Sequence, residues 1–143
     1  MTVQTPAERL GVLVKQTQAV LHQRMDEALQ PIGLSVPQYV CLQTLADTPG
    51  ITGSELARRV FVSRQSMSVL LQGLERKGLV ERASDPGPRR ERTTSLTAAG
   101  RDLVPDARRR VAVVADRMTG GLDNDALAQL ETSLRACRDA LLG

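Results

Sequence analysis

The chain has 143 residues, with 19 Lys or Arg against 16 Asp or Glu, a formal net charge of +3 and two cysteines. This length is typical of one domain, and two widely separated cysteines exclude a disulfide framework. Charged residues interrupt every apolar stretch, including residues 1–30, so we expect neither a signal peptide nor a membrane-spanning helix but a single cytoplasmic domain over 1–143.

The first predicted element is a helix over about 6–29, which Pro31 and Gly33 end. Its apolar residues recur at steps of three and four and form one stripe: Leu10, Leu13, Val14, Thr17, Val20, Leu21, Met25 and Ala28. A second helix begins at Ser35, because Ser35 and Gln38 make an S-x-x-Q capping box. It ends at the turn residues 47–50.

Two short helices joined by a tight turn are predicted next. Thr52 and Glu55 form a T-x-x-E capping box for the first, and Ser63 caps the second. Gly78 ends the second helix at a position that favours glycine. One face of this second helix is apolar, with Met67, Leu70, Leu71 and Leu74. The opposite face carries side chains able to meet phosphates, base edges or a thymine methyl: Arg64, Gln65, Ser68, Val69 and Gln72.

A β-hairpin follows, with strands over 79–82 and 92–96 and turn residues between them. Helix, turn, helix and hairpin in this order are typical of a winged helix-turn-helix. From Arg58 to Arg92 there are nine basic residues against four acidic ones, a surplus of five, although the whole chain is only +3. Positive charge gathered on a groove-sized helix and a hairpin is typical of a protein that binds duplex DNA.

Two long helices complete the chain. Thr97 is expected to cap a helix that reaches about Met118, and Pro105 inside it should remove one hydrogen bond and bend it. Asp123 is expected to cap the last helix, whose apolar seam continues to its end: Leu127, Leu130, Leu134, Cys137 and Leu141. We predict that this seam, with Leu10, Leu13 and Val14, forms a two-fold interface between two chains. The alternative is an intramolecular hairpin with the first helix.

Three segments give the chain a resemblance to the MarR family of bacterial transcription regulators. Residues 33–39 (GLSVPQY) resemble the start of the family's second helix, and residues 74–80 (LERKGLV) resemble the end of its recognition helix. Residues 96–100 (LTAAG) resemble the exit from its wing. The resemblance covers nearly all of the chain. It implies a mostly α fold with a small β-hairpin wing (α+β), with a winged helix-turn-helix DNA-binding lobe over 35–97 and dimerisation helices over 1–30 and 100–143.

The same resemblance implies a function. We expect a homodimeric repressor that binds an inverted-repeat operator in double-stranded DNA and is released by a small aromatic or apolar effector. The expected DNA-binding residues lie on the recognition helix and the wing: Ser63, Arg64, Gln65, Ser66, Ser68, Val69, Gln72, Arg89, Arg90 and Arg92. Arg90 matches the family's wing arginine by its spacing to Leu96 and Thr97. The family usually has an acid two residues before that arginine, where this chain has Pro88.

Two other function classes fit the sequence less well. An enzyme is not expected, because the sequence has no nucleophile elbow, no glycine-rich phosphate loop and no histidine beside a Ser or Cys. The single histidine, His22, and two separate cysteines make no metal site, so no metal or cofactor is expected. A winged-helix protein-interaction module without specific DNA binding is the alternative, although it would not need Arg64, Gln65 and an arginine-rich wing together.

Two features of the sequence have a structural interpretation. Cys41 lies among apolar residues and is expected to be a small buried hydrophobe. The run Arg108–Arg109–Arg110 points in three directions on a helix, so we expect a solvated face with ion pairs to Asp102, Asp106 or Asp116.

Overall fold

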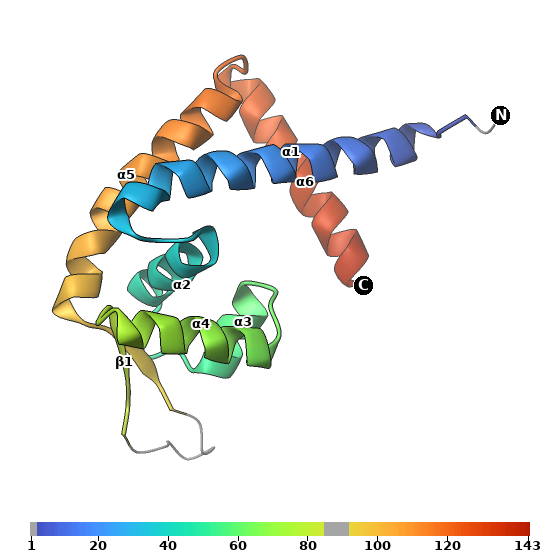
Figure 1. Cartoon of the computed structure of the whole chain (residues 1–143). Coiled ribbons are helices and arrows are strands. Elements are labelled where there is room, and N and C mark those ends of the chain that lie inside the picture. Colours follow the sequence, from blue (N-terminus) through green and yellow to red (C-terminus); the bar gives the residue numbers. More distant parts are fainter. Residues whose placement is uncertain (1–2, 85–91) are drawn as a thin grey trace.

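The structure is a computed structural model that describes residues 3–84 and 92–143. Over these residues the elements follow one another as α1 (Pro6–Leu29), η1 (Gln30–Ile32), α2 (Val36–Asp47), α3 (Gly53–Arg59), α4 (Arg64–Arg76), β1 (Val80–Arg82), β2 (Thr94–Leu96), α5 (Ala98–Thr119) and α6 (Asn124–Leu142). The fold is mostly helical with a two-stranded antiparallel sheet, as predicted (Figure 1).

The helices begin at the predicted caps, because a side-chain oxygen there accepts a backbone N–H that has no partner within the helix. Ser35 and Gln38 form a reciprocal capping box at α2. At α3 the Thr52 hydroxyl accepts the Glu55 N–H, while the Glu55 carboxylate accepts from that hydroxyl, both at 3.2 Å. The side chains of Ser63, Thr97 and Asp123 start α4, α5 and α6 in the same way.

The core lies inside a lobe made by α2, α3, α4 and the two strands, closed by the C-terminal end of α1 and the first half of α5. The leucines Leu29, Leu42, Leu56 and Leu74 are completely buried there. Helix α5 packs against both α1 and α2, and α3 packs against α4 (Figure 1). The packing of α5 therefore ties the lobe to the long N-terminal helix.

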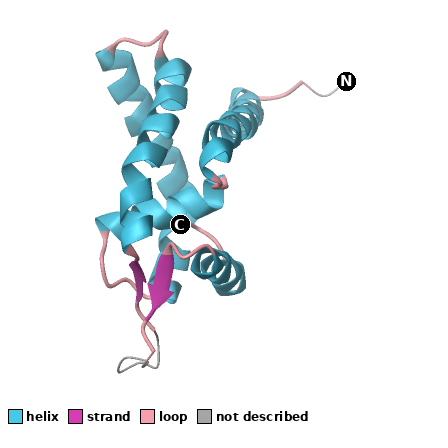
Figure 2. Cartoon of the chain, turned by 60° about the vertical axis from the view of Figure 1, so that its left-hand side comes forward, coloured by secondary structure: helices cyan, strands magenta, loops and turns pink. Residues whose placement is uncertain are grey.

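The wing begins directly after α4. Strands β1 and β2 pair antiparallel in the register Val80↔Leu96, Glu81↔Ser95 and Arg82↔Thr94, and Figure 2 shows them at the end of the lobe. Both strands are shorter than predicted. The N–H of Leu79 bonds to the carbonyl of Leu74 and closes the end of α4 around Gly78, which has φ 73°. Leu79 therefore belongs to the helix cap, and β2 begins at Thr94 after an isolated bridge between Thr52 and Thr93.

Helix α5 starts in close contact with the root of the wing. A Cβ atom on Gly100 would lie 2.1 Å from the carbonyl oxygen of Leu79, so only glycine fits at this point. The Thr97 hydroxyl donates to the carbonyl of Gly78 at 2.6 Å, and the Thr97 N–H donates to that of Leu79 at 3.0 Å. Pro105 lies inside α5 as predicted; the bend that we expect there stays a prediction.

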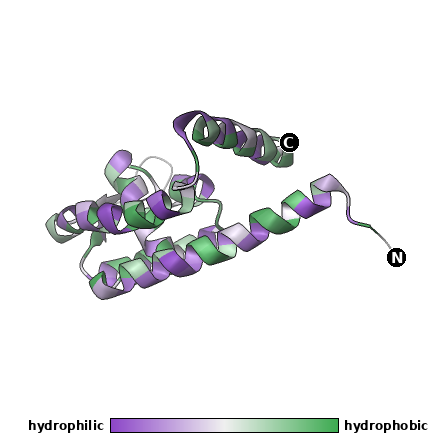
Figure 3. Ribbon diagram, turned by 90° about the horizontal axis from the view of Figure 1, so that it is seen from above, coloured by the Kyte–Doolittle hydropathy of each residue, from purple (hydrophilic) through white to green (hydrophobic). Residues whose placement is uncertain are grey.

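The N-terminal half of α1 and the whole of α6 extend past the lobe (Figure 1). Helix α6 is described throughout, and none of its residues is buried. Figure 3 shows hydrophobic residues interspersed with polar ones along both helices. Among the described helices, none is long and apolar enough to cross a membrane.

Candidate nucleic-acid interface

Helix α4 has two distinct faces. Met67, Leu71 and Leu74 point into the core and are buried. The opposite face, which the sequence predicted to meet DNA, is open to solvent. The side chains of Arg64, Gln65, Val69 and Gln72 are exposed, and that of Ser68 is half-buried beside them. This arrangement leaves a row of donors, acceptors and one apolar group free along a helix of 13 residues.

The first turn of α4 carries two serine hydroxyls. The Ser63 hydroxyl accepts the Ser66 N–H at 3.0 Å and donates its own hydrogen to the Ser66 hydroxyl at 3.0 Å. The hydrogen of the Ser66 hydroxyl is not used in this pair. Of the two serines, Ser66 is therefore the better placed to donate to a phosphate, and Ser63 acts mainly as the helix cap.

A contact that the sequence analysis missed joins α4 to the wing. Arg82 of β1 forms an ion pair with Glu75 of α4, with Nε 2.7 Å from Oε1. Its Nη2 atom also donates to the carbonyl of Ser68 at 3.2 Å. The signal in the sequence is a pair of opposite charges seven residues apart across Gly78, where the chain reverses from helix to strand.

The wing residues are described only in part. Arg92 is exposed, just before β2. Arg89, Arg90 and the Pro88 position lie outside the described residues, so their contribution to the interface stays a prediction.

The predicted dimerisation residues are exposed in the single chain, on the N-terminal part of α1 and along α6: Leu10, Leu13, Val14, Leu127, Leu130, Leu134, Cys137 and Leu141. Leu130 and Leu134, in the middle of α6, keep 45% and 44% of their surface in contact with solvent. Exposed apolar residues gathered along two helices in this way indicate an interaction site.

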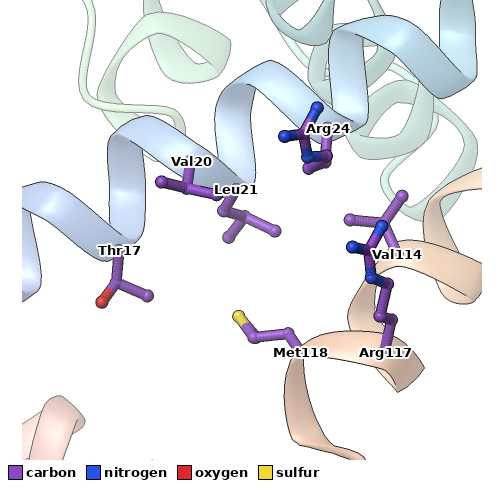
Figure 4. A pocket seen from close by; sticks show the side chains of 7 residues that line it. All are labelled: Thr17, Val20, Leu21, Arg24, Val114, Arg117 and Met118. Atoms are coloured by element: carbon purple, nitrogen blue, oxygen red, sulfur yellow. The ribbon is translucent and has the colours of Figure 1, made fainter.

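A pocket of about 330 Å³ opens between α1 and α5. Its lining is mostly apolar, with Val20 and Leu21 from α1 facing Val114 and Met118 from α5 (Figure 4). Thr17, Arg24 and Arg117 complete the lining. Arg24 is engaged by Glu27 at 2.8 Å. The pocket is therefore a mostly apolar cavity between α1 and α5, two of the helices that the sequence predicted to form the dimer interface.

The link between the lobe and α5 includes an ion pair that was not predicted. Arg109 and Arg110 pair with Asp106, as expected for a solvated helix face. Arg108 pairs instead with Asp47, the last residue of α2, at 2.6 Å. The expected ion pairs within α5 therefore form at Arg109 and Arg110, whereas the packing of α2 on α5 gives Arg108 a partner outside its own helix.

Two titratable side chains of α2 have raised pKa values because they are buried. Burial raises the pKa of the Tyr39 hydroxyl, with the nearby Arg108 opposing the shift and Asp47 adding to it. Burial also raises the pKa of the Cys41 thiol to about 11. The Cys41 Sγ lies 3.6 Å from the Met67 Sδ, so the expectation of a small buried hydrophobe is confirmed.

Comparison with known proteins finds a matching family and related transcription regulators. Residues 32–91 match a family model described as the MarR family. The HTH-type transcriptional repressor Rv2887 of Mycobacterium tuberculosis (strain ATCC 25618 / H37Rv) is 41% identical over 105 residues, which cover 73% of each chain.

Solved structures give the same family context. A MarR-family transcriptional regulator from Rhodococcus sp. RHA1 superposes with a TM-score of 0.85 at 25% identity, over 94% of this chain and 97% of that one. Rv2887 in complex with DNA superposes with a TM-score of 0.73 at 32% identity, over 94% and 98%. Rv2887 has also been solved in complex with salicylic acid, and that structure superposes with a TM-score of 0.72 at 32% identity, over 96% and 99%.

Proposed function

This chain belongs to the MarR family of winged helix-turn-helix transcription regulators, and we propose that it acts in the bacterial cytoplasm as a homodimeric repressor of inverted-repeat operators. The observation that carries the proposal is the division of α4 into a buried apolar face and an exposed face with Arg64, Gln65, Val69 and Gln72. A structure of the relative Rv2887 in complex with DNA supports the same use of the fold.

Recognition follows from the chemistry of the exposed face. Helix α4 enters the major groove with its N-terminal turn first, so Arg64 and Gln65 come nearest to the base edges. Arginine pairs with the O6 and N7 atoms of guanine and glutamine with the N6 and N7 atoms of adenine, while Val69 offers an apolar contact to a thymine methyl. Ser66 and the free N–H groups of the first turn bind phosphate and fix the register of the helix.

The wing extends this contact beyond the major groove. Arg90 is proposed to reach the neighbouring minor groove, where a narrow A·T tract concentrates negative potential. Arg89 and Arg92 are proposed to contact the phosphate backbone on either side.

Dimerisation supplies the second recognition helix. Leu130 and Leu134 of α6, and Leu10 and Leu13 of α1, stay exposed in the single chain, and their burial against a second chain would remove this apolar surface from water. We propose that an apolar side chain of the partner fills the pocket between α1 and α5 (Figure 4). A two-fold interface of this kind presents two α4 helices to successive major grooves, roughly 34 Å apart on one face of the duplex.

We propose that the repressor leaves its operator when a small effector binds between the lobe and the dimer helices. The complex of Rv2887 with salicylic acid supports a small aromatic acid as the class of effector. Such a ligand can weaken DNA binding only if its affinity differs between two spacings of the recognition helices. Arg108 and Asp47 span the boundary between α5 and α2, at which that spacing would change.

The experiment that tests the proposal is selection of bound sequences from a pool of random duplexes. A homodimeric reader enriches an inverted repeat whose half-sites are centred about one helical turn apart. Enrichment of single half-sites would contradict the dimer. Retention of duplex without any enriched sequence, or no retention at all, would contradict specific DNA reading and favour a protein-interaction module.

A further inference from the structure

Phe61 holds a backbone position that normally belongs to glycine. At the end of α3 the N–H of Val62 bonds to the carbonyl of Ala57 at 3.1 Å, and the N–H of Phe61 bonds to that of Arg58 at 3.4 Å. This pair of bonds is the Schellman motif, in which the residue after the cap takes the left-handed conformation. Phe61 has φ 59° and is the one non-glycine residue with positive φ within 3–84 and 92–143.

The end of α4 shows what the position favours. Gly78 stands there in the same motif, with φ 73°. Glycine adopts this conformation without steric cost, whereas a bulky side chain in it is a strained outlier. Phe61 therefore destabilises the turn relative to glycine.

Packing within the chain does not offset this strain. The Phe61 side chain is 66% exposed, and it is the chain's one phenylalanine. The backbone of Phe61 is strained and its ring is open to solvent, so burial of the ring contributes little to the stability of the folded chain. Strain of this kind is retained where the surroundings in the functional state make use of it.

The position of Phe61 indicates what covers the ring. Phe61 lies two residues before Ser63, the cap of α4, and so borders the turn that approaches DNA. Figure 1 shows this α3–α4 turn at the opposite end of α4 from the wing. Arg58 and Arg59, just before the turn, are exposed and positive. An exposed apolar ring close in sequence both to these cations and to the first turn of α4 suits the DNA backbone, which presents the C–H groups of a sugar between two phosphates.

We propose that the Phe61 ring packs against a deoxyribose of the bound duplex, at the edge of the surface formed by α4. The inference rests on the proposed function, since it requires α4 to face DNA. A sugar carries no sequence information, so this contact raises affinity for every duplex and does not select among them. The strained residue then lowers the stability of the free protein and raises its affinity for DNA.

The test is the substitution Phe61→Gly, measured by thermal unfolding and by titration of two duplexes, the selected operator and a random sequence. The variant is expected to unfold a few degrees higher than the parent, because the turn loses its strain. Its affinity is expected to fall about tenfold for both duplexes alike. The slope of log affinity against log salt should not change, because an apolar contact releases no counterions.

Two further substitutions separate the ring from the backbone. Phe61→Asn tolerates the left-handed conformation but offers no ring, and should lose affinity as Phe61→Gly does. Phe61→Tyr keeps a ring and should bind both duplexes as the parent does. Parental affinity of Phe61→Gly for both duplexes would overturn the contact, and so would a loss confined to the operator or a flatter salt slope. If the parent itself binds no duplex, the proposed function fails as well. If the parent binds and Phe61→Gly binds equally tightly, only the Phe61 contact fails.

Discussion

The guanidinium of Arg82 joins the wing to the recognition helix through Glu75, with 2.7 Å between Nε and Oε1. The same guanidinium donates to the carbonyl of Ser68, so one side chain contacts α4 at two points about two turns apart. Because Arg82 is the last residue of β1, this clamp sets the direction in which the hairpin leaves α4. Simultaneous contact with a major groove and its neighbouring minor groove requires that direction to be fixed.

Substitution of Arg82 by Ala should therefore weaken operator binding more than it weakens the fold. The ion pair is partly exposed, so the free energy of unfolding should fall by about 1 kcal/mol. Hydrogen exchange of the β1 and β2 amides should become faster while that of α2 is unchanged. Arg82→Lys keeps the charge but lacks the planar fork that meets both partners, so it should behave like Arg82→Ala. Full operator affinity in both variants would show that the clamp does not position the wing.

Substitution of Arg64 by Ala tests base reading by α4. If Arg64 pairs with guanine, the variant should lose about 1–3 kcal/mol of binding free energy on the operator and much less on a random duplex. Helical content and mass should match those of the parent, because the Arg64 side chain is exposed. Equal losses on the two duplexes would make Arg64 a phosphate contact.

The wing arginines differ in their expected effects. Arg90→Ala should weaken binding and reduce the preference for A·T pairs beside the half-sites, because its target is a narrow minor groove. Arg92→Ala, as a backbone contact, should instead lower the salt slope by about one ion. Titration of operators with A·T and G·C flanks separates the two effects. If Arg90→Ala keeps the parent's preference for A·T flanks, Arg90 does not read the minor groove. The replacement of the family's usual acid by Pro88 would then have cost the arginine this role.

Burial of Cys41 makes stability depend on pH at the alkaline end. The folded thiol has a pKa of about 11, above the ordinary value of 9.0, because the thiolate would be buried. The unfolded chain loses this proton first as pH rises, so the stabilisation is complete below pH 9 and is lost between pH 9 and 11. Urea unfolding at pH 7.5 and pH 10.5 should show the loss.

The matched variant for this test is Cys41→Ala. Tyr39 titrates in the same direction and contributes to the loss in both proteins. The alanine variant should therefore show a smaller decrease between the two pH values than the parent does. Equal decreases would mean that Cys41 ionises as freely in the folded chain as in the unfolded one.

The sequence predicted most of the fold where the signal lies within a few residues. The caps at Ser35, Thr97 and Asp123 depend on a side chain and an N–H three residues away, and all three are confirmed. The apolar face of α4 followed from its helical spacing in the same way.

Contacts between distant segments could not be predicted from local patterns. Arg108 had several acidic residues within its own helix, but the packing of α2 against α5 brought it to Asp47, 61 residues away. The clamp of Arg82 on α4 depends on the tight reversal at Gly78, which carries β1 back along the helix. Phe61 was missed because phenylalanine gives no sign in the sequence that it will take a glycine conformation.

Specific binding is proposed to require two chains, which present two α4 helices to one inverted repeat. The decisive measurement is titration of the selected operator by the double variant Leu130→Glu, Leu134→Glu, with sedimentation to give the mass. The paired variant Gln129→Glu, Ser133→Glu adds the same charges one residue earlier and is the control. Placing like charges across the two-fold interface should leave the leucine variant a folded monomer. We predict that its operator affinity falls at least about 100-fold while its weak binding to random duplex is largely kept, because the monomer retains one recognition helix and wing. A leucine variant that stays dimeric would rule out this interface, and a monomer that binds the operator as tightly as the parent would rule out the need for two chains.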